Sequence, residues 1–264
     1  MHSRYPAARP IGMLLAALSL TACASVPPEQ RVEHDPWEGM NRSLYRFNDV
    51  VDRATLKPVA RGYRKILPEP VRRSVDNFGR NLATPRSAVN NFLQGKGEGG
   101  FSELARFIIN STFGIGGLFD IATAGGLRAR TEDFGQTAAV WGIPPGPFVM
   151  LPFLGPQTLR DALLMPADVR FDPLYHYEVS SVRDPLYVLR IIDLRAQILP
   201  LEDLLQDSQD PYVTLRESYL QNREFEIYDG NPPMEDEYFD EFFEEDYEET
   251  TDEEFDQPYD LDEE

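Results

Sequence analysis

The sequence predicts an all-α fold for its central part, and three observations lead to this prediction. Apolar residues recur at intervals of three and four along most of residues 35–228, which is the spacing of one face of an amphipathic helix. Runs that alternate apolar and polar residues, as a half-buried strand would, are scarce. One long apolar stretch interrupts the helical pattern, and it holds too many prolines for a helix.

The first predicted helix follows Asp35, and its apolar face consists of Leu44, Phe47, Val50 and Val51. Pro58 fits the first turn of the next helix, where its missing N–H group is harmless. A further apolar stripe is formed by Val71, Val75, Phe78 and Leu82. Helical spacing continues in later segments, which we predict at about 86–94, 101–112, 115–124, 157–165, 184–198, 200–206 and 211–227.

Residues 134–159 form a stretch of 26 residues without a charged side chain. Its five prolines each remove a backbone donor, which a continuous helix exposed to lipid could not tolerate. We predict a helix to about Trp141 and then an apolar hairpin or re-entrant loop, either buried by the rest of the domain or inserted shallowly into a bilayer. The candidate residues of this loop are Gly142, Pro144, Pro145, Gly146, Pro147, Phe148, Pro152, Phe153 and Gly155.

The N-terminal residues have the order of features of a secretory signal peptide. Arg4 and Arg9 supply the basic start, and ten apolar residues follow at 11–20. Ten helical residues span about 15 Å, too short for a hydrocarbon core of about 30 Å. The residues Leu20-Thr21-Ala22-Cys23 match the cleavage box of a bacterial lipoprotein, so we predict a signal peptide at 1–22 and acyl chains on Cys23.

Cys23 is the single cysteine of the chain, so no internal disulfide can form. Ala24 follows it, and the absence of Asp at this position is compatible with sorting to an outer membrane. Residues 23–34 are polar and contain two adjacent prolines, which predicts an extended tether.

The net charge of −20 is concentrated at the C-terminal end. Residues 229–264 hold 19 of the 45 acidic residues and no Lys or Arg, which leaves 26 acidic and 25 basic residues before them. Self-repulsion and the scarcity of aliphatic residues predict a disordered tail. Its acidic and aromatic composition is also typical of a segment that docks on a basic partner, and both interpretations stay open.

Residues 57–86 are locally basic, with eight Lys or Arg and two acidic residues. Arginine binds phosphate with two parallel hydrogen bonds, and cations beside apolar helix faces suit an interface with anionic head groups. The alternative is ordinary salt-bridged helix faces. The candidate head-group contacts are Arg61, Arg64, Arg72 and Arg73.

Several other functions find little support. The Gly-rich segment at 95–100 matches G-x-G-x-x-G, but no strand precedes it, so we interpret it as a loop between helices rather than a nucleotide site. Only His34 and His176 follow the signal segment, and no hydrolase or metal motif is present, which favours a protein without enzymatic activity, metal or cofactor. An exported, anchored protein rarely meets nucleic acid.

Short motifs then follow one another in an order that resembles one family, the MlaA (VacJ) lipoproteins of the outer membrane. The likeness covers about residues 35–228 and does not extend to the acidic tail. The matching motifs are Asp35-Pro36-Trp37-Glu38-Gly39-Met40-Asn41-Arg42, Leu56-Lys57-Pro58-Val59-Ala60, Asn90-Asn91-Phe92-Leu93-Gln94-Gly95, Arg106-Phe107, Asn110-Ser111-Thr112, Gly116-Gly117, Glu132-Asp133-Phe134-Gly135-Gln136-Thr137, Trp141-Gly142, Gly146-Pro147 to Leu151-Pro152, Gly155-Pro156 to Arg160-Asp161, Arg195-Ala196-Gln197 and Asp210-Pro211-Tyr212.

The resemblance implies a ring of amphipathic helices that lies in the inner, periplasmic leaflet of the outer membrane, with a polar channel and a trimeric porin as partner. It also implies removal of mislocalised phospholipids from the outer leaflet and their delivery to a soluble carrier of the MlaC type. An envelope phospholipase and a membrane-anchored scaffold that binds porin without moving lipid are the alternatives.

Overall fold

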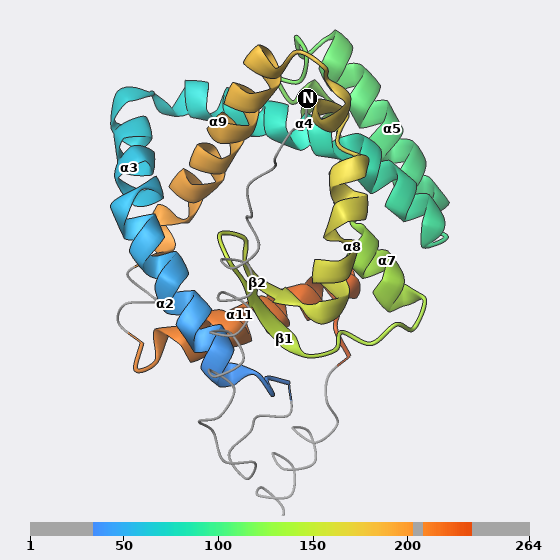
Figure 1. Ribbon diagram of the computed structural model, residues 1–264. Helices are drawn as coiled ribbons and strands as arrows, with labels where there is room; N and C mark the ends of the chain where they lie inside the picture. The colour runs from blue at the N-terminus through green and yellow to red at the C-terminus, as the bar shows by residue number, and fades with distance from the viewer. Residues whose placement is uncertain (1–33, 203–207, 234–264) are drawn as a thin grey trace, which may run out of the picture. The chain divides into compact units, whose positions relative to one another are not determined.

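Helices account for most of residues 34–202 and 208–233, which are the residues that the computed structural model describes (Figure 1). The chain divides into two compact units, Met1–Arg223 and Glu224–Glu264, and each is considered by itself. In the described part of the second unit, the Gly230 N–H donates to the Phe225 carbonyl at 2.8 Å beyond the end of the last helix.

The elements of the first unit follow one another with short connections. They are α2 (Glu38–Ala54), α3 (Leu56–Ile66), α4 (Glu69–Leu93), α5 (Gly97–Thr112), α6 (Ile121–Ala124), α7 (Phe134–Val140), β1 (Phe148–Leu151), β2 (Gly155–Thr158), α8 (Leu159–Arg170), the 3-10 helix η3 (Pro173–His176), α9 (Ser180–Ile198), the 3-10 helix η4 (Leu199–Leu201) and α11 (Pro211–Ile227), whose last residues belong to the second unit.

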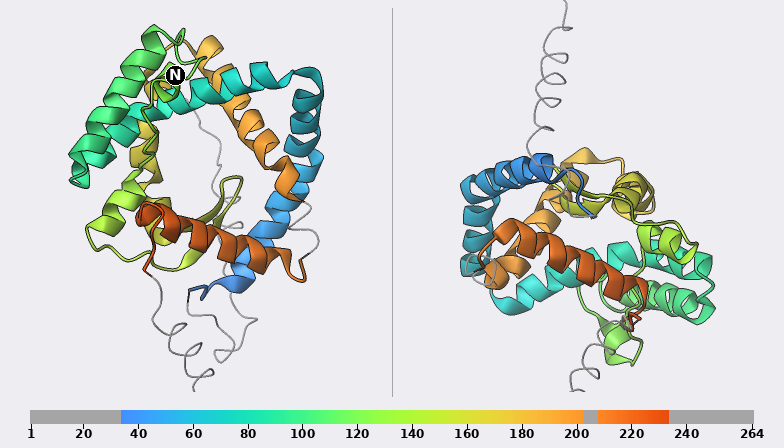
Figure 2. Two further views of the ribbon diagram at one scale, coloured as in Figure 1. Left: turned by 180° about the vertical axis from the view of Figure 1, so that it is seen from behind. Right: turned by 90° about the horizontal axis from the view of Figure 1, so that it is seen from below.

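The first unit is a ring of elements. Its contacts form a closed circuit, in which α2 packs on α3, α3 on α9, α9 on α4, α4 on α7, α7 on α8, α8 on β1, and β1 on α2. Helix α5 lies along the outer side of α4, and both the front view and the view from behind show this arrangement (Figures 1 and 2). The predicted all-α ring with an apolar hairpin is confirmed.

Two small apolar clusters lie within the ring. Ala60 and Tyr63 of α3 pack against Ala196 of α9, and the Tyr63 hydroxyl donates to the Asp193 carboxylate at 2.7 Å. The second cluster joins the hairpin to the start of α11 through Phe148, Met150 and Tyr212. Each cluster fixes one junction between elements rather than filling the centre of a globule.

Helix α4 runs without interruption through Pro85, whereas the sequence predicted separate segments on either side of this residue. A proline inside a helix removes one hydrogen bond and is usually disruptive. Here α4 packs against α5, α7 and α9, and these contacts hold the flanking turns in one helix.

Two other expectations need correction. Residues 115–120 are not helical, because Ile115, Gly116 and Gly117 have positive φ angles, and only Ile121–Ala124 of the predicted segment forms a helix. Residues 155–158 form strand β2 before α8 begins at Leu159. Residues 203–206 of the predicted segment at 200–206 lie outside the described residues.

The Gly-rich segment is only partly a loop, since α5 begins at Gly97. Its glycines let α4 and α5 approach each other closely. A Cβ atom at Gly100 would lie 2.6 Å from the ring of Phe92 on α4, which is closer than real contacts allow. The glycine pattern therefore serves helix packing in this fold.

Candidate functional site

The first unit buries polar side chains and exposes apolar ones, which is the reverse of the usual distribution. Among the described residues, 19 polar or charged residues are buried and only 11 hydrophobic ones are, and five of these 11 are small alanines on helices α3, α4, α6, α7 and α9. Many large apolar side chains remain exposed, and they are distributed over nearly every helix of the ring.

Two helices carry exposed apolar stripes. On α5, Phe101 and Ile108 are 70% and 62% exposed, and Leu104 lies between them on the same face. On α9 the corresponding stripe consists of Val188, Ile191, Leu194 and Ile198. Soluble monomers rarely expose apolar surfaces of this extent. Such surfaces usually mark sites of contact with a membrane or another protein.

The predicted apolar loop is an antiparallel hairpin, and its two ends differ in burial. Phe148, at the base, is fully buried and pairs with Thr158, whereas Phe153, at the tip, is 71% exposed beside the exposed Leu154. Pro147 is half-buried, and the remaining predicted loop residues Gly142, Pro144, Pro145, Gly146 and Pro152 are exposed while Gly155 is half-buried. The base of the loop is thus buried by the rest of the domain, and insertion of the exposed tip into a bilayer stays a prediction.

Asn41 of α2 holds the base of the hairpin. Its amide donates to the Phe148 carbonyl at 3.0 Å and to Asp35 at 2.8 Å, and its carbonyl oxygen accepts from the Met150 N–H at 2.9 Å. Asp35 is fully buried and also accepts from Arg216 of α11 at 3.0 Å. Asp35 also accepts from the Tyr212 hydroxyl, and this hydrogen bond joins the motifs at 35–42 and 210–212.

A second buried ion-pair network joins α7, α8 and α11. Arg223 pairs with Asp133 at 2.7 Å and with Asp161 at 2.9 Å. Asp133 also caps α7, because its side chain accepts from the Gln136 N–H while the Gln136 side chain accepts from the Asp133 N–H. Burial alone would raise the pKa of Asp161, but the charges of Arg223 and Arg160 lower it.

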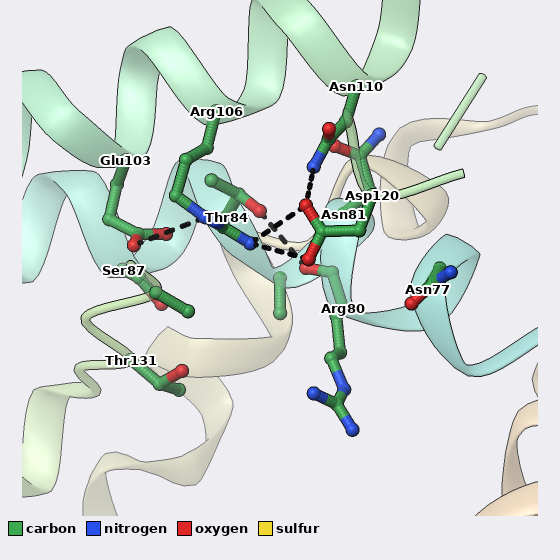
Figure 3. Close-up of a pocket in the computed structure, with 12 residues that line it drawn as sticks. Asn77, Arg80, Asn81, Thr84, Ser87, Glu103, Arg106, Asn110, Asp120 and Thr131 are labelled. Atoms are coloured by element: carbon green, nitrogen blue, oxygen red, sulfur yellow. Dashed lines mark hydrogen bonds and ion pairs between the residues drawn. The ribbon is translucent and has the colours of Figure 1, made fainter. Parts of the chain in front are cut away.

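A polar cavity of about 230 Å³ lies between α4, α5 and the loop that leads to α6. Its lining includes Asn77, Arg80 and Asn81 from α4, Glu103 and Arg106 from α5, and Asp120 at the cap of α6 (Figure 3). The cavity is smaller than a typical pocket for a drug-sized molecule, and its size suits several waters or one small polar group.

Arg106 organises one side of this cavity. Its guanidinium donates to both oxygens of Asp120, at 3.1 and 3.3 Å, and to Thr123 at 2.8 Å. Burial alone would raise the pKa of Asp120, but hydrogen bonds from Thr123 and Asn110 and the charge of Arg106 outweigh this effect and lower it to about 2. Burial raises the pKa of Glu103, against the hydrogen bond that it accepts from the Arg130 N–H.

The four candidate arginines lie in different surroundings. Arg61 and Arg64 are exposed on α3 and form no ion pair with a described residue, whereas Arg73 pairs with Glu69 on α4. Arg72 is half-buried, and its Nε atom has no hydrogen-bond partner among the described residues. Their role as head-group contacts stays a prediction.

Other candidate features lie beyond the described residues. The signal segment 1–22, Cys23, most of the tether and the tail from 234 onward are all outside them. In the part of the chain that the structure describes, no group of His, Cys, Asp or Glu could hold a metal ion. None of the described helices is long and apolar enough to cross a membrane.

The cavity was not predicted, although the sequence contains a signal for it. Glu103, Arg106 and Asn110 follow one another at intervals of three and four, so they share one face of α5. The exposed stripe of Phe101, Leu104 and Ile108 lies on another face. A charged stripe on one face of a helix and an apolar stripe on another indicate that the helix packs its polar groups against a neighbouring element.

An apolar exterior around polar contacts defines a ring of amphipathic helices suited to an apolar environment. The family model described as "MlaA lipoprotein" matches residues 33–226. The chain is 39% identical over 217 residues to the "Intermembrane phospholipid transport system lipoprotein MlaA" of Escherichia coli (strain K12), covering 81% of this chain and 86% of that protein.

The corresponding protein of Haemophilus influenzae is 33% identical over 223 residues, which cover 82% of this chain and 89% of that protein. A solved structure reported as "Structural basis for maintenance of bacterial outer membrane lipid asymmetry" is similar with a TM-score of 0.66 and 38% identity, over 73% of this chain and 98% of that one. The chain belongs to the MlaA lipoprotein family.

Proposed function

We propose that the chain is an outer-membrane lipoprotein that removes mislocalised phospholipids from the outer leaflet and passes them to a periplasmic carrier. The observation that supports this proposal is a ring of helices that buries polar side chains between its elements while large apolar side chains stay exposed. A phospholipid head group needs a polar path while its tails prefer hydrocarbon, and a ring of two-faced helices offers one surface to each.

The exposed apolar surfaces and the exposed arginines occupy different depths of the membrane in this proposal. The apolar stripes of α5 and α9 face hydrocarbon, and the hairpin tip at Phe153 and Leu154 inserts shallowly beside them. The exposed cations Arg61 and Arg64, with Arg72 and Arg73, contact phosphate groups at the membrane surface.

The remaining segments complete the proposed organisation. Residues 1–22 direct export, and residues 23–34 tether the ring, residues 35–228, to acyl chains on Cys23. The chains keep the protein in the periplasmic leaflet, because several acyl chains anchor far more stably than one. The tail 229–264, most of which lies outside the described residues, extends beyond the family match at 33–226.

A trimeric porin and a soluble carrier of the MlaC type are the proposed protein partners. A porin would hold the ring beside the outer leaflet, and the carrier would accept the lipid on the periplasmic side. Lipid gradients and the affinity of the carrier set the direction of transport, without a chemical step in the chain itself.

Surface labelling of phospholipids in cells tests the proposal. Deletion of the gene should raise the amount of phospholipid that an impermeant amine reagent labels from outside, and the wild-type chain should restore the low level. A Cys23→Ala variant should fail to restore it and should incorporate no labelled fatty acid, because the ring would lack its anchor.

The two alternatives predict other results. A scaffold that only binds porin would leave surface phospholipid unchanged on deletion. An envelope phospholipase would release lyso-lipid from vesicles when the purified chain is added, whereas the proposed transporter leaves every ester bond intact.

A further inference from the structure

The polar groups that line the cavity between α4 and α5 do not all pair with one another. Arg106 and Asp120 neutralise each other at its upper end, and Arg80 extends away from this pair (Figure 3). The Arg80 guanidinium is largely exposed at the rim and pairs with Asp76 at 2.6 Å. The inner lining therefore holds two carboxylates, Glu103 and Asp120, for one guanidinium.

Glu103 is the carboxylate that can accept further hydrogen bonds. Its side chain is 4% exposed, and its Oε1 atom accepts from the Arg130 N–H at 2.6 Å. The nearest cation, Arg106, lies 3.8 Å away and directs its terminal nitrogens to Asp120 and Thr123 instead. A buried carboxylate with so few donors gains from a cation that brings N–H groups to it.

Asn81 supplies a second unmet acceptor in the same cavity. This residue is only 4% exposed, and its amide nitrogen donates to the Ser111 hydroxyl at 2.9 Å. Its Oδ1 atom is buried and has no hydrogen-bond partner among the described residues. Buried acceptors of this kind are uncommon in native structures unless water or a ligand satisfies them.

The surface next to the cavity is apolar. The loop that carries Asp120 also presents Phe113, Ile115 and Phe119 to the outside, and the Leu118 carbonyl accepts from Asn77 at 3.3 Å. Gly117 in this loop packs so closely on Asn81 that a Cβ atom would come within 2.7 Å of its Cγ atom. A polar cavity beside an exposed apolar loop suits an amphiphilic ligand, which has a polar and an apolar part, better than a purely polar solute.

We propose that this cavity binds the head group of a phospholipid that carries a primary ammonium, with the ammonium donating to Glu103 and Asn81 and the phosphate lying toward Arg80. The inference rests on the proposed function in phospholipid transport. Both acceptors require N–H donors, which a primary ammonium has and a quaternary ammonium lacks. The apolar loop at 113–119 receives the start of the acyl chains.

Lipid selection by the purified full chain tests the proposal. The chain in detergent is equilibrated with vesicles that contain equal amounts of phosphatidylethanolamine and phosphatidylglycerol, then re-isolated, and the bound lipids are measured by mass spectrometry. Wild-type protein should be enriched in phosphatidylethanolamine. Glu103→Gln should lower the enrichment by about tenfold, the effect of losing one charge-assisted hydrogen bond.

Three further variants separate the roles of the groups. Asn81→Leu should also lower the enrichment, and Arg80→Gln should reduce the amount of both lipids without changing their ratio, since both carry phosphate. Glu98→Gln removes an exposed carboxylate from the same helix and should change neither. Glu103→Gln keeps an oxygen for the Arg130 N–H, and its unchanged melting temperature would show that the fold is retained.

The outcomes distinguish the cavity from the wider function. Bound lipid without a preference in wild-type protein, or an unchanged ratio in Glu103→Gln, would each overturn the head-group site alone. Equal enrichment of phosphatidylcholine, in vesicles where it replaces phosphatidylethanolamine, would overturn it as well. Absence of any bound phospholipid would instead contradict the proposed function. Stabilisation of the wild type, but not of Glu103→Gln, by soluble phosphoethanolamine without enrichment of any lipid would assign the cavity to a free solute and overturn the lipid assignment.

Discussion

Asn41 shows how much one residue can contribute where the core is small. It is fully buried and joins α2 to the hairpin and to Asp35 through both ends of its side chain. Asn41→Leu keeps the size of the side chain but leaves the Phe148 carbonyl, the Met150 N–H and one Asp35 oxygen without this partner. We expect a loss of at least about 2 kcal/mol in the free energy of unfolding.

Denaturant unfolding in detergent, followed by circular dichroism, measures this loss. Asn231→Leu, at an exposed asparagine beyond the end of α11, is the matched control and should change the free energy by less than about 0.5 kcal/mol. Equal effects of the two substitutions would show that the Asn41 contacts do not stabilise the fold.

Asp168 of α8 carries a charge that the fold opposes. Burial raises its pKa to about 6, against the attraction of Arg86 at 3.7 Å and together with the repulsion from Asp133. The raised pKa means that the folded chain binds this proton more tightly than the unfolded chain. The contribution of Asp168 to stability is therefore complete below about pH 4 and is lost as the pH rises through about 6.

Asp168→Asn removes this dependence, because the amide is neutral at every pH and its oxygen can still accept from the Phe134 N–H. We expect a higher melting temperature than wild type at pH 7 and little difference near pH 4. Melting curves across this range measure the effect. A variant that is less stable than wild type at pH 7 would mean that the Arg86 ion pair outweighs the burial cost.

At the scale of elements, local spacing in the sequence predicted most helices but not where they end. Pro85 suggested a break in α4 that packing against α5, α7 and α9 prevents. The helical spacing at 115–120 gave the wrong structure, because Gly116 and Gly117 adopt positive φ angles that spacing does not reveal. Tertiary contacts and backbone conformation decide both cases, and neither is visible in a hydrophobic pattern.

The sequence predicted the apolar hairpin and the basic helices of the candidate site, but not its polar cavity. The density of prolines and the absence of charge were enough to predict an apolar hairpin, but not that Phe148 is buried while Phe153 is exposed. Basic composition pointed to α3 and the start of α4. The polar cavity joins residues 77–87 to residues 103–131 across a helical hairpin, so only the packed structure brings Asn81 and Glu103 together.

At the scale of the whole molecule, the first unit buries few large apolar side chains and exposes many. Transfer of apolar surface from water is the main driving force of folding, so a chain with this distribution is stabilised further when lipid covers its outer faces. The exposed stripe of α5 should therefore bind membranes without help from the acyl chains.

A Cys23→Ala variant expressed without residues 1–22 carries no acyl chains, so its binding to vesicles measures the contribution of the apolar surface. Phe101→Lys combined with Ile108→Lys should lower the fraction that floats with vesicles, with at least about a hundredfold weaker partitioning, because each buried apolar side chain contributes about 1.5–3 kcal/mol. Ser180→Lys combined with Ser181→Lys adds the same charge to exposed polar positions at the start of α9 and should leave flotation unchanged. Equal flotation of both double variants would mean that the α5 stripe does not lie in the lipid, and that another surface covers it.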